Sequence, residues 1–367
     1  MPQRYRVLLL IPHLGGGGAE RVTELLAQHL SSAKYDLHLS LVAASTPPVP
    51  LPGVTLHALS ASRVRNSLLP LLRLVRHLKP EVILSTMAHL NFAVLTLRPF
   101  YPRGTRILVR QNGTASAMLA GLRSPAITRR MYRVLYPRAN RILCQSQSMA
   151  DDLHTTAAIP RGLLAVVPNP VDIDTIRAQS IACTARSAGP HLLSVGRLAV
   201  EKGHDLLLDA FARVREVFPQ ASLSIAGQGG EEIHLQAQAA RLGIHDSVRF
   251  LGHVDTPAAL YGAATAFVLP SRHEGMPNAL LEAAAAGLPL IATPASGGIA
   301  DLLRDQPGAW LARAISAPAL AEALITALGC LQPGTRFAHP WIDNFSLARS
   351  IAAYEEVIDD ALAQGRA

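Results

Sequence analysis

Short apolar runs recur along the chain, and segments with a helical spacing of apolar residues separate many of them. Each short run has the length and composition of a buried strand. These runs occupy residues 6–11, 36–43, 54–59, 82–86, 106–110, 141–145 and 164–167 in the first half, and 191–195, 222–226, 248–251, 266–270 and 290–292 in the second. The alternation of strands and helices predicts an α/β fold with parallel sheets that carry helices on both faces.

The strand pattern breaks once, near the middle of the chain. Residues 173–189 carry many polar side chains and end in Ala-Gly directly before Pro190, so they are expected to form a linker. Because 367 residues exceed one ordinary core, we expect two domains, over residues 1–175 and 176–345. The run at 54–59 follows a proline-rich loop and is expected to be an edge strand.

The strand-like runs of the second half end in glycine, proline or a small polar residue: Gly196, Gly227, Gly252, Pro270 and Thr293. In a doubly wound sheet, ligands bind at the carboxyl ends of the strands. The segments that follow these positions are therefore the candidates for a binding site.

The segment after Pro270, SRHEGMPNALLEAAAAG, carries two acids. Glu274 lies in a turn, and Glu282 lies on a helix predicted over 278–286, with Pro277 in its first turn. A helix N-terminus suits an anion, so the carboxylates are better suited to accept hydrogen bonds from hydroxyl groups. The expected ligand has an anionic middle and two polyol ends, as a nucleotide-sugar has. Two solvated surface glutamates are the simple alternative.

Two cations follow the first strand of the second half, in the segment GRLAVEKG. Arg197 offers a planar fork to phosphate oxygens, and Lys202 supplies a point charge. Either residue alone could be an ordinary surface cation. At a strand end, with two predicted strands between them and the glutamate pair along the chain, they predict a site for a diphosphate.

Four consecutive glycines, Gly15 to Gly18, lie between the first strand and a helical pattern over 19–30. Such a turn lets the backbone approach a phosphate or a sugar closely. The segment is neither a Walker loop nor a dinucleotide fingerprint, because Ala19 and Glu20 follow the glycines. A simple connector is the alternative.

Positive charge is concentrated in the first half of the chain. Through Ser180 there are 21 Lys and Arg residues against 8 Asp and Glu, whereas the remainder has 13 against 18. Two basic stretches, 63–79 and 123–141, mix arginine with apolar residues at helical spacing, which is typical of helices at a membrane surface. Solvated helix faces are the alternative. Nucleic acid is not expected, since aromatic residues are 5% and no recognition motif is present.

Other features indicate a protein of the cytoplasm. The three cysteines are far apart, which excludes a disulfide framework and a Cys-type zinc site. The first apolar run is too short for a secretory signal. Residues 283–300 carry no charge, but glycines and prolines break them, so we reject a membrane span. We expect a cytoplasmic protein, peripheral on the inner face of the cytoplasmic membrane.

Six motifs occur in a specific order: GGGGAER (15–21), PNPVD (168–172), GRLAVEKG (196–203), AGQGGEE (226–232), FLGHV (250–254) and EGMPNALLEAAAAGLP (274–289). With this set the chain resembles the family-four retaining glycosyltransferases of the GT-B fold, over most of its length. The resemblance implies two Rossmann-like, doubly wound parallel-sheet domains that face a central cleft. The N-terminal domain would bind the acceptor and the C-terminal domain the nucleotide-sugar, and residues 346–367 would form a helix that crosses back to the N-terminal domain.

The resemblance also implies roles for individual residues. Arg197 and Lys202 would hold the donor diphosphate, Glu282 the ribose, and Glu274 the transferred sugar. Arg197, Lys202 and Glu274 are thus the catalytic candidates. The remaining donor-binding candidates are Gly16, Gly17, Gly196, Gly227, His253, Val254, Gly275, Met276, Pro277 and Asn278.

The acceptor side departs from the family pattern. Many members carry a histidine after the strand that corresponds to 106–110, whereas this chain has Gln111, Asn112 and Gly113 there. His89, which follows the preceding strand, could substitute for that histidine, although an ordinary loop histidine fits as well. The acceptor-side candidates are therefore His89, Gln111 and Asn112.

These features predict a retaining glycosyltransferase that needs neither a metal nor another cofactor. It would move a hexose or N-acetylhexosamine from a nucleotide-sugar to a lipid-linked or polysaccharide acceptor in cell-envelope synthesis. Met276 to Asn278 resemble members that use UDP-sugars, so UDP is favoured over GDP. Arg197 and Lys202 would stabilise the charge on the leaving diphosphate. A GT-B epimerase or phosphorylase and a non-catalytic two-lobed sugar-nucleotide-binding protein remain as alternatives.

Overall fold

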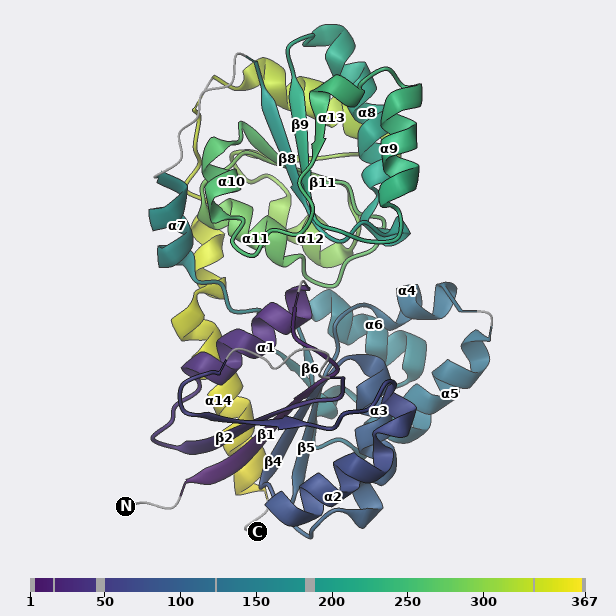
Figure 1. The fold of residues 1–367 in the computed structure, drawn as a ribbon, viewed down its shortest axis with the longest axis vertical. Helices are drawn as coiled ribbons and strands as arrows, with labels where there is room; N and C mark the ends of the chain where they lie inside the picture. The colour runs from purple at the N-terminus through teal and green to yellow at the C-terminus, as the bar shows by residue number, and fades with distance from the viewer. Residues whose placement is uncertain are drawn as a thin grey trace. The chain divides into compact units, whose positions relative to one another are not determined.

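The computed structural model describes residues 4–15, 17–43, 50–122, 124–181, 189–332 and 334–364. The chain forms two compact units. Unit 1 comprises Met1–Pro170 and Ala348–Ala367, and unit 2 comprises Val171–Leu347. Each unit contains one parallel sheet with helices on its faces (Figure 1). Every strand predicted from the sequence is present within two residues of its expected bounds.

In the sheet of unit 1 the first strand of the chain is internal, and later strands are added on both sides of it. Its order is β3 (Val54–Ala58), β2 (Tyr35–Leu41), β1 (Tyr5–Ile11), β4 (Val82–Thr86), β5 (Arg106–Arg110), β6 (Arg141–Cys144) and β7 (Leu164–Val166). All neighbouring pairs are parallel. The strand order reverses between β1 and β4, where ligands bind in doubly wound sheets. β3 is an edge strand, as predicted.

The helices of unit 1 cover this sheet because each has an apolar face. They are α1 (Gly18–His29), α2 (Leu68–Leu78), α3 (Ala88–Leu97), α4 (Ala115–Ala120), α5 (Pro125–Leu135), α6 (Gln147–Ala157) and α14 (Leu347–Ala363), with short 3₁₀ turns at η1 (Val64–Asn66), η2 (Arg98–Phe100), η3 (Tyr136–Arg138) and η4 (Arg161–Leu163). Helices α2 and α5 lie within the two basic stretches, 63–79 and 123–141, and Arg123 lies outside the described residues. Pro70 lies in the first turn of α2 and Pro137 lies beyond α5, so neither interrupts a helix.

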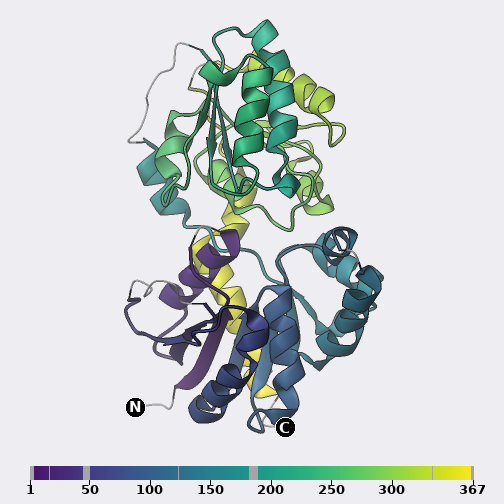
Figure 2. The same cartoon turned by 45° about the vertical axis from the view of Figure 1, so that its right-hand side comes forward.

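Helix α14 packs against the strands of unit 1, as both cartoon views show (Figures 1 and 2). Tyr354 is fully buried, and its hydroxyl accepts a hydrogen bond from Arg110 Nε at 3.0 Å. The hydroxyl of Tyr35 donates to Asp359 at 2.6 Å. The last helix of the chain therefore completes the core of the unit in which the chain begins.

Unit 2 repeats the same topology with six strands. Its order is β10 (Val248–Phe250), β9 (Ser222–Ala226), β8 (His191–Val195), β11 (Ala266–Leu269), β12 (Leu290–Ala292) and β13 (Ala309–Leu311). The helices are α7 (Ile173–Ile181), α8 (His204–Val217), α9 (Glu232–Arg241), α10 (Ala258–Ala263), α11 (Asn278–Ala285), α12 (Gly297–Leu303) and α13 (Ala317–Cys330), with turns η5 (Val200–Lys202), η6 (His245–Ser247) and η7 (Pro340–Phe345). Alternate strand residues supply two apolar clusters, one on each face of the sheet.

Two elements of unit 2 differ from the expectation. Residues 173–181 form helix α7, so the predicted linker is wrong there, and residues 182–188 lie outside the described residues. The helix is held through Ser180, whose hydroxyl donates to the carbonyl of Ala258 at 3.1 Å, and it is too polar to show an apolar stripe. Strand β13 was not predicted; its three residues are only partly buried and do not form part of a longer apolar run.

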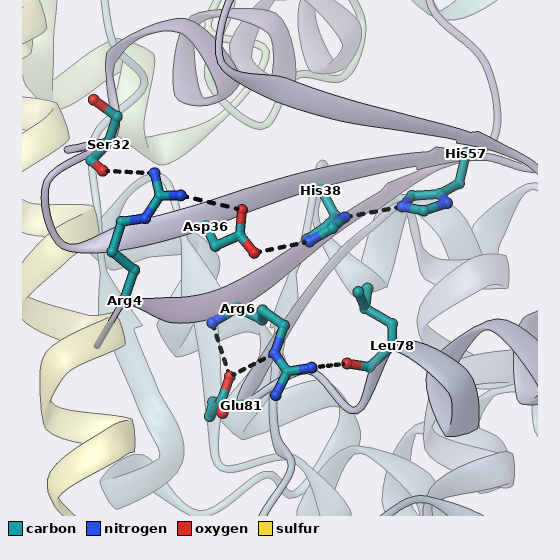
Figure 3. Close-up of polar contacts among 8 residues, drawn as sticks. All are labelled: Arg4, Arg6, Ser32, Asp36, His38, His57, Leu78 and Glu81. Carbon is teal, nitrogen blue, oxygen red and sulfur yellow. Dashed lines mark hydrogen bonds and ion pairs between the residues drawn. The ribbon is translucent and has the colours of Figure 1, made fainter. Parts of the chain in front are cut away.

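Polar side chains tie the outer strands of unit 1 together (Figure 3). Asp36 Oδ2 lies 3.4 Å from His38 Nε2, and His38 Nδ1 lies 2.9 Å from His57 Nε2, across β2 and β3. Burial lowers the pKa of His57. On β1, the backbone N–H of Arg6 donates to Glu81 at 2.8 Å. The contact between the histidines thus joins β2 to the edge strand β3, and the contact between Arg6 and Glu81 joins β1 to the residue that precedes β4.

Replacing Tyr354 with phenylalanine should lower the free energy of unfolding by about 1–3 kcal/mol, because Arg110 Nε would lose its acceptor in a buried place. Urea denaturation of the full chain measures the change. Tyr101 is the matched control: its hydroxyl is buried and has no hydrogen-bond partner among the described residues. Tyr101→Phe should therefore leave the stability unchanged or raise it. Equal losses in the two variants would contradict this account of α14.

Candidate active site

The loops at the carboxyl ends of β8, β9 and β10 pack backbone against backbone. The N–H of Gly196 donates to the carbonyl of Ala226 at 2.9 Å, and the N–H of Gly227 donates to the carbonyl of Gly252 at 2.7 Å. A Cβ atom on Gly227, whose φ is +140°, would lie 1.9 Å from the carbonyl oxygen of Gly196. Glycine is therefore required at 227 by the packing of the loops themselves.

A second close approach joins the loop after β8 to the loop after β11. Gly203 has a φ of +66°, and a Cβ atom there would lie 2.1 Å from the carbonyl oxygen of Pro270. The N–H of Arg272 donates to the carbonyl of Glu201 at 2.8 Å, and the Arg272 guanidinium makes two 2.6 Å bonds to Asp205. These contacts bring η5 beside the turn that carries Glu274.

Lys202 and Glu274 meet at this junction. Lys202 Nζ lies 2.7 Å from Glu274 Oε1, and the hydroxyl of Ser271 donates to the same oxygen at 2.7 Å. The side chains are 22% and 7% exposed, so this ion pair is largely shielded from water. The acid and the cation predicted to act on one ligand are thus in direct contact with each other.

Arg197 lies on the same loop as Lys202 but is open to solvent. Its side chain is 64% exposed, and its Nη2 lies 2.9 Å from Glu201 Oε1. An exposed ion pair of this kind contributes at most about 1 kcal/mol, so Arg197 can exchange Glu201 for another anion at little cost. Both cations that are predicted to bind the diphosphate are therefore already paired with a carboxylate of the protein.

Glu282 lies one turn into α11 and is partly buried. It accepts a hydrogen bond of 2.9 Å from the hydroxyl of Tyr261, which is fully buried. Burial, with a further contribution from Glu282, raises the pKa of Tyr261 well above its usual value. The phenol therefore stays protonated and orients the carboxylate by donating to it.

His204 begins α8 directly after Gly203 and was not singled out from the sequence. Its side chain is 2% exposed, and its Nδ1 has no hydrogen-bond partner among the described residues. Burial lowers the pKa of His204 to about 4, with the charge of Lys202 acting in the same direction. The imidazole is therefore neutral near pH 7 and lies close enough to Lys202 to be affected by its charge. Its only sequence signal was its place after the GRLAVEKG segment.

The other donor-side candidates have varied surroundings. Gly275 and Pro277 are buried, and Met276 packs on the apolar cluster of α11. Pro277 occupies the N-cap of α11 and not its first turn, so that detail of the expectation is wrong. His253 is exposed and lies 3.0 Å from Asp255, and Val254 is partly buried beside it.

In unit 1 the glycine-rich turn leaves room for a side chain of α1, the helix that follows it. Gly17 is the N-cap of α1, and a Cβ atom there would lie 2.2 Å from Glu20 Oε2. Glu20 is 6% exposed and lies 3.5 Å from His13 Nδ1. At Gly17 the missing side chain thus makes room for a carboxylate of the protein. Gly16 lies outside the described residues.

His89 lies in the first turn of α3, after β4, with its side chain largely exposed. Burial of its ring on one side lowers the pKa of His89, and the charge of His13 adds to the effect. His13, Glu20 and His89 thus lie around the point where the strand order reverses between β1 and β4. Met87, before α3, has a φ of +79°, a strained conformation of the kind that occurs at functional sites.

Gln111 and Asn112 differ in accessibility. Gln111 is 1% exposed, and its amide accepts from Tyr136 at 2.7 Å and donates to Tyr132 at 3.1 Å. Its polar atoms are therefore engaged inside unit 1. Asn112 is partly buried, and its Oδ1 accepts a hydrogen bond of 2.8 Å from Arg110 Nη1. Of the two, Asn112 is the one placed to meet a ligand.

Within the described residues, no three His, Cys, Asp or Glu side chains gather as metal ligands would. One Asp-x-Asp sequence is present, at Asp172 and Asp174, but Asp172 accepts a hydrogen bond from the N–H of Thr175 at the start of α7. No helix in the described ranges is long and apolar enough to span a membrane.

Two family models match the chain. One, described as "Glycosyltransferase Family 4", matches residues 16–175, and the other, described as "Glycosyl transferases group 1", matches residues 189–329. Together they cover most of both units.

Similar proteins were found among curated sequences and solved structures. N-acetylgalactosamine-N,N'-diacetylbacillosaminyl-diphospho-undecaprenol 4-alpha-N-acetylgalactosaminyltransferase of Campylobacter jejuni is 28% identical over 81% of this chain and 83% of its own. The amylovoran biosynthesis glycosyltransferase AmsD of Erwinia amylovora is 24% identical over 82% of this chain and 84% of its own. The crystal structure of HepE from Anabaena in complex with UDP and glucose has a TM-score of 0.79 at 18% identity, and covers 97% of this chain and 100% of HepE. The predicted GT-B fold is thereby confirmed.

Replacing Gly203 with alanine should destabilise the protein more than replacing Gly243. The two glycines have φ values of +66° and +68°, so alanine meets the same backbone penalty at both. Only at 203 does the added Cβ atom collide with another residue, the carbonyl of Pro270; at 243 nothing lies within 4 Å. We expect an excess loss of about 1–3 kcal/mol for Gly203→Ala in urea denaturation. Equal losses would show that the two loops can separate without cost.

Proposed function

The chain belongs to the group 1 glycosyltransferases of family 4, and we propose that it is a retaining, metal-independent enzyme that takes its sugar from a nucleotide-sugar. The observation that carries the proposal is the contact between Lys202 and Glu274. Lys202 and Glu274 are held together at a strand end, where the cation would bind the diphosphate of such a donor and the acid would bind its sugar.

Donor binding would exchange the partners of both cations. The diphosphate would take Arg197 from Glu201 and Lys202 from Glu274, because the diphosphate of a nucleotide-sugar carries two negative charges whereas a carboxylate carries one. Glu274 Oε1 would then be left with the hydroxyl of Ser271 and could accept hydrogen bonds from the sugar. Glu282, oriented by Tyr261, would accept from the ribose hydroxyls.

The same cations would promote the reaction. As the bond between the sugar and the diphosphate breaks, negative charge grows on the leaving oxygen, and Arg197 and Lys202 would stabilise it. A preorganised donor of this kind contributes about 3–4 kcal/mol. With retention, the leaving phosphate oxygen would take the proton of the acceptor hydroxyl on the same face of the sugar. Inversion at the anomeric carbon, seen by NMR of the product, would contradict this step.

The comparisons support a narrower choice of substrates. HepE was solved with UDP and glucose, and the Campylobacter enzyme is named for transfer to a diphospho-undecaprenol acceptor. AmsD is named for amylovoran biosynthesis. We therefore favour a UDP-hexose or UDP-N-acetylhexosamine as donor, bound by unit 2, and a lipid-linked or polysaccharide acceptor in cell-envelope synthesis, bound by unit 1.

Lys202→Ala should reduce the hydrolysis or transfer of the preferred donor by about 10²–10³ in kcat, because Lys202 is proposed to stabilise the leaving group. A screen of UDP-, GDP- and ADP-sugars identifies that donor. Arg213, an exposed cation on α8, provides the control: Arg213→Ala should keep full activity.

Turnover retained by Lys202→Ala would contradict the proposed role of the cation. Binding of UDP without turnover of any donor would instead favour the non-catalytic sugar-nucleotide-binding alternative. Conversion of the donor to an epimeric sugar would favour the epimerase.

The charge of unit 1 supports contact with an anionic membrane. Between Asp36 and Asp151 the chain has 15 Lys and Arg residues and a single acid, Glu81. Helices α4 and α5 and the residues between them also expose large apolar side chains: Met118, Leu122, Ile127 and Val134. Exposed arginines lie among these apolar residues on α5. This combination fits peripheral binding to the inner face of the cytoplasmic membrane.

Replacing Arg129, Arg130 and Arg133 together with alanine should weaken binding to vesicles that contain anionic lipid by roughly a hundredfold, since each basic residue contributes about 1 kcal/mol. Co-sedimentation with the vesicles measures the effect. A control variant lacks three exposed arginines of unit 2, Arg213, Arg241 and Arg249, and should bind as the unchanged protein does. Equal binding by all three proteins would contradict the membrane proposal.

A further inference from the structure

Three polar side chains share one face of the unit 1 sheet at the carboxyl ends of β5 and β6. Arg110 pairs in register with Leu143, and Asn112 and Gln145 follow these two residues by two positions, just beyond the ends of the two neighbouring strands. Side chains alternate between faces with a period of two, which places Arg110, Asn112 and Gln145 on the same face. This is the face that α14 covers, because Arg110 contacts Tyr354.

Arg110 is a buried cation held only by neutral groups. It is 2% exposed, and it donates to the Tyr354 hydroxyl at 3.0 Å, to Asn112 Oδ1 at 2.8 Å and to Asn169 Oδ1 at 2.6 Å. It makes no ion pair with any carboxylate of the described residues. A buried charge is usually compensated by an opposite one, so the field of Arg110 remains available to an anion.

The amide of Asn112 carries a donor that the protein does not use. Its oxygen must turn toward Arg110, because a guanidinium only donates, and its Nδ2 then points away. That nitrogen is buried and has no hydrogen-bond partner in the described part of the chain. An unpaired buried donor is costly and indicates a missing acceptor.

Gln145 adds a second unpaired amide. Its side chain is 3% exposed, and its Nε2 likewise has no partner among residues 4–364 where the structure describes them. Helix α6 begins two residues later, so the N–H groups of its first turn and the positive end of its dipole lie at the same sheet edge. All of these groups favour negative charge.

We propose that Arg110, Asn112 and Gln145 form a subsite for an oxyanion carried by the acceptor substrate. The proposal rests on the function proposed above, because unit 1 is taken to bind the acceptor. Asn112 and Gln145 donate hydrogen bonds to the oxyanion, while Arg110 orients Asn112 and supplies the charge. The oxyanion is either a phosphoryl group, as on a lipid phosphate or a sugar phosphate, or the carboxylate of an acidic sugar.

The test follows the side-chain N–H signals of Gln145 and Arg110 in the ¹⁵N-labelled full chain while inorganic phosphate or acetate is added. We expect one or both anions to shift these signals, and the one that binds more tightly identifies the oxyanion. Asn112→Asp replaces the unpaired donor with a negative charge and should weaken this binding at least tenfold. The same variant should melt at an unchanged or higher temperature, because a carboxylate then faces Arg110.

Two further variants make the test decisive. Asn66→Asp, at an exposed position, introduces the same charge elsewhere in unit 1 and should leave the anion affinity unchanged. Gln145→Leu removes an amide that has no protein partner at its buried nitrogen, and should also weaken binding while the protein stays folded. The proposal is overturned if neither anion shifts the signals, or if Asn112→Asp and Gln145→Leu bind as the unchanged protein does.

The proposed subsite and the proposed enzymatic activity can be contradicted independently of each other. Lys202→Ala should lose donor turnover and keep the anion-induced shifts of Gln145, since the two groups belong to different units. Turnover that persists in this variant would contradict the donor site alone, whereas lost shifts in the unchanged protein would contradict the subsite alone.

Discussion

The ion pair between Lys202 and Glu274 joins two loops that are 72 residues apart in the chain. Removing one partner from such a shielded pair usually costs about 3–5 kcal/mol, because the other charge is left unpaired. The pair can therefore open readily only when a new anion reaches Lys202 and new hydrogen-bond donors reach Glu274. A nucleotide-sugar supplies both at once, through its diphosphate and its sugar hydroxyls. In the proposed function, the contact that joins these two loops would thus also select the ligand that can replace it.

Backbone packing holds this pair in place. The loops after β8, β9 and β11 approach one another so closely that Gly203 and Gly227 have no room for a side chain. The cations consequently sit on a rigid support, which suits groups that must meet the growing charge of a transition state without rearrangement. Arg197 differs, because it is exposed and held only by Glu201. A shielded cation and an exposed cation therefore lie on the same loop.

The sequence contains most of the fold and the outline of the site, and the reasons are local. All strands except β13 are visible as short apolar runs. Because a parallel sheet brings the carboxyl ends of its strands to one edge, Arg197, Lys202, Glu274 and Glu282 could be grouped from the sequence. What could not be predicted depends on contacts between distant residues. Examples are the ion pair of Lys202 with Glu274, the hydrogen bond from Tyr261 to Glu282, and the Glu20 carboxylate that occupies the space left by Gly17. The role of Gln111 also changed, since two tyrosines that follow it by 21 and 25 residues engage its amide.

The most direct test of this account is a crystal structure of the protein with a bound nucleotide-sugar or UDP. The account predicts that Lys202 Nζ leaves Glu274 and lies within hydrogen-bond distance of a phosphate oxygen, with Glu274 turned to the sugar when one is present. A complex in which the nucleotide is fully bound while Lys202 still pairs with Glu274, or in which the diphosphate lies away from the loop after β8, would contradict it.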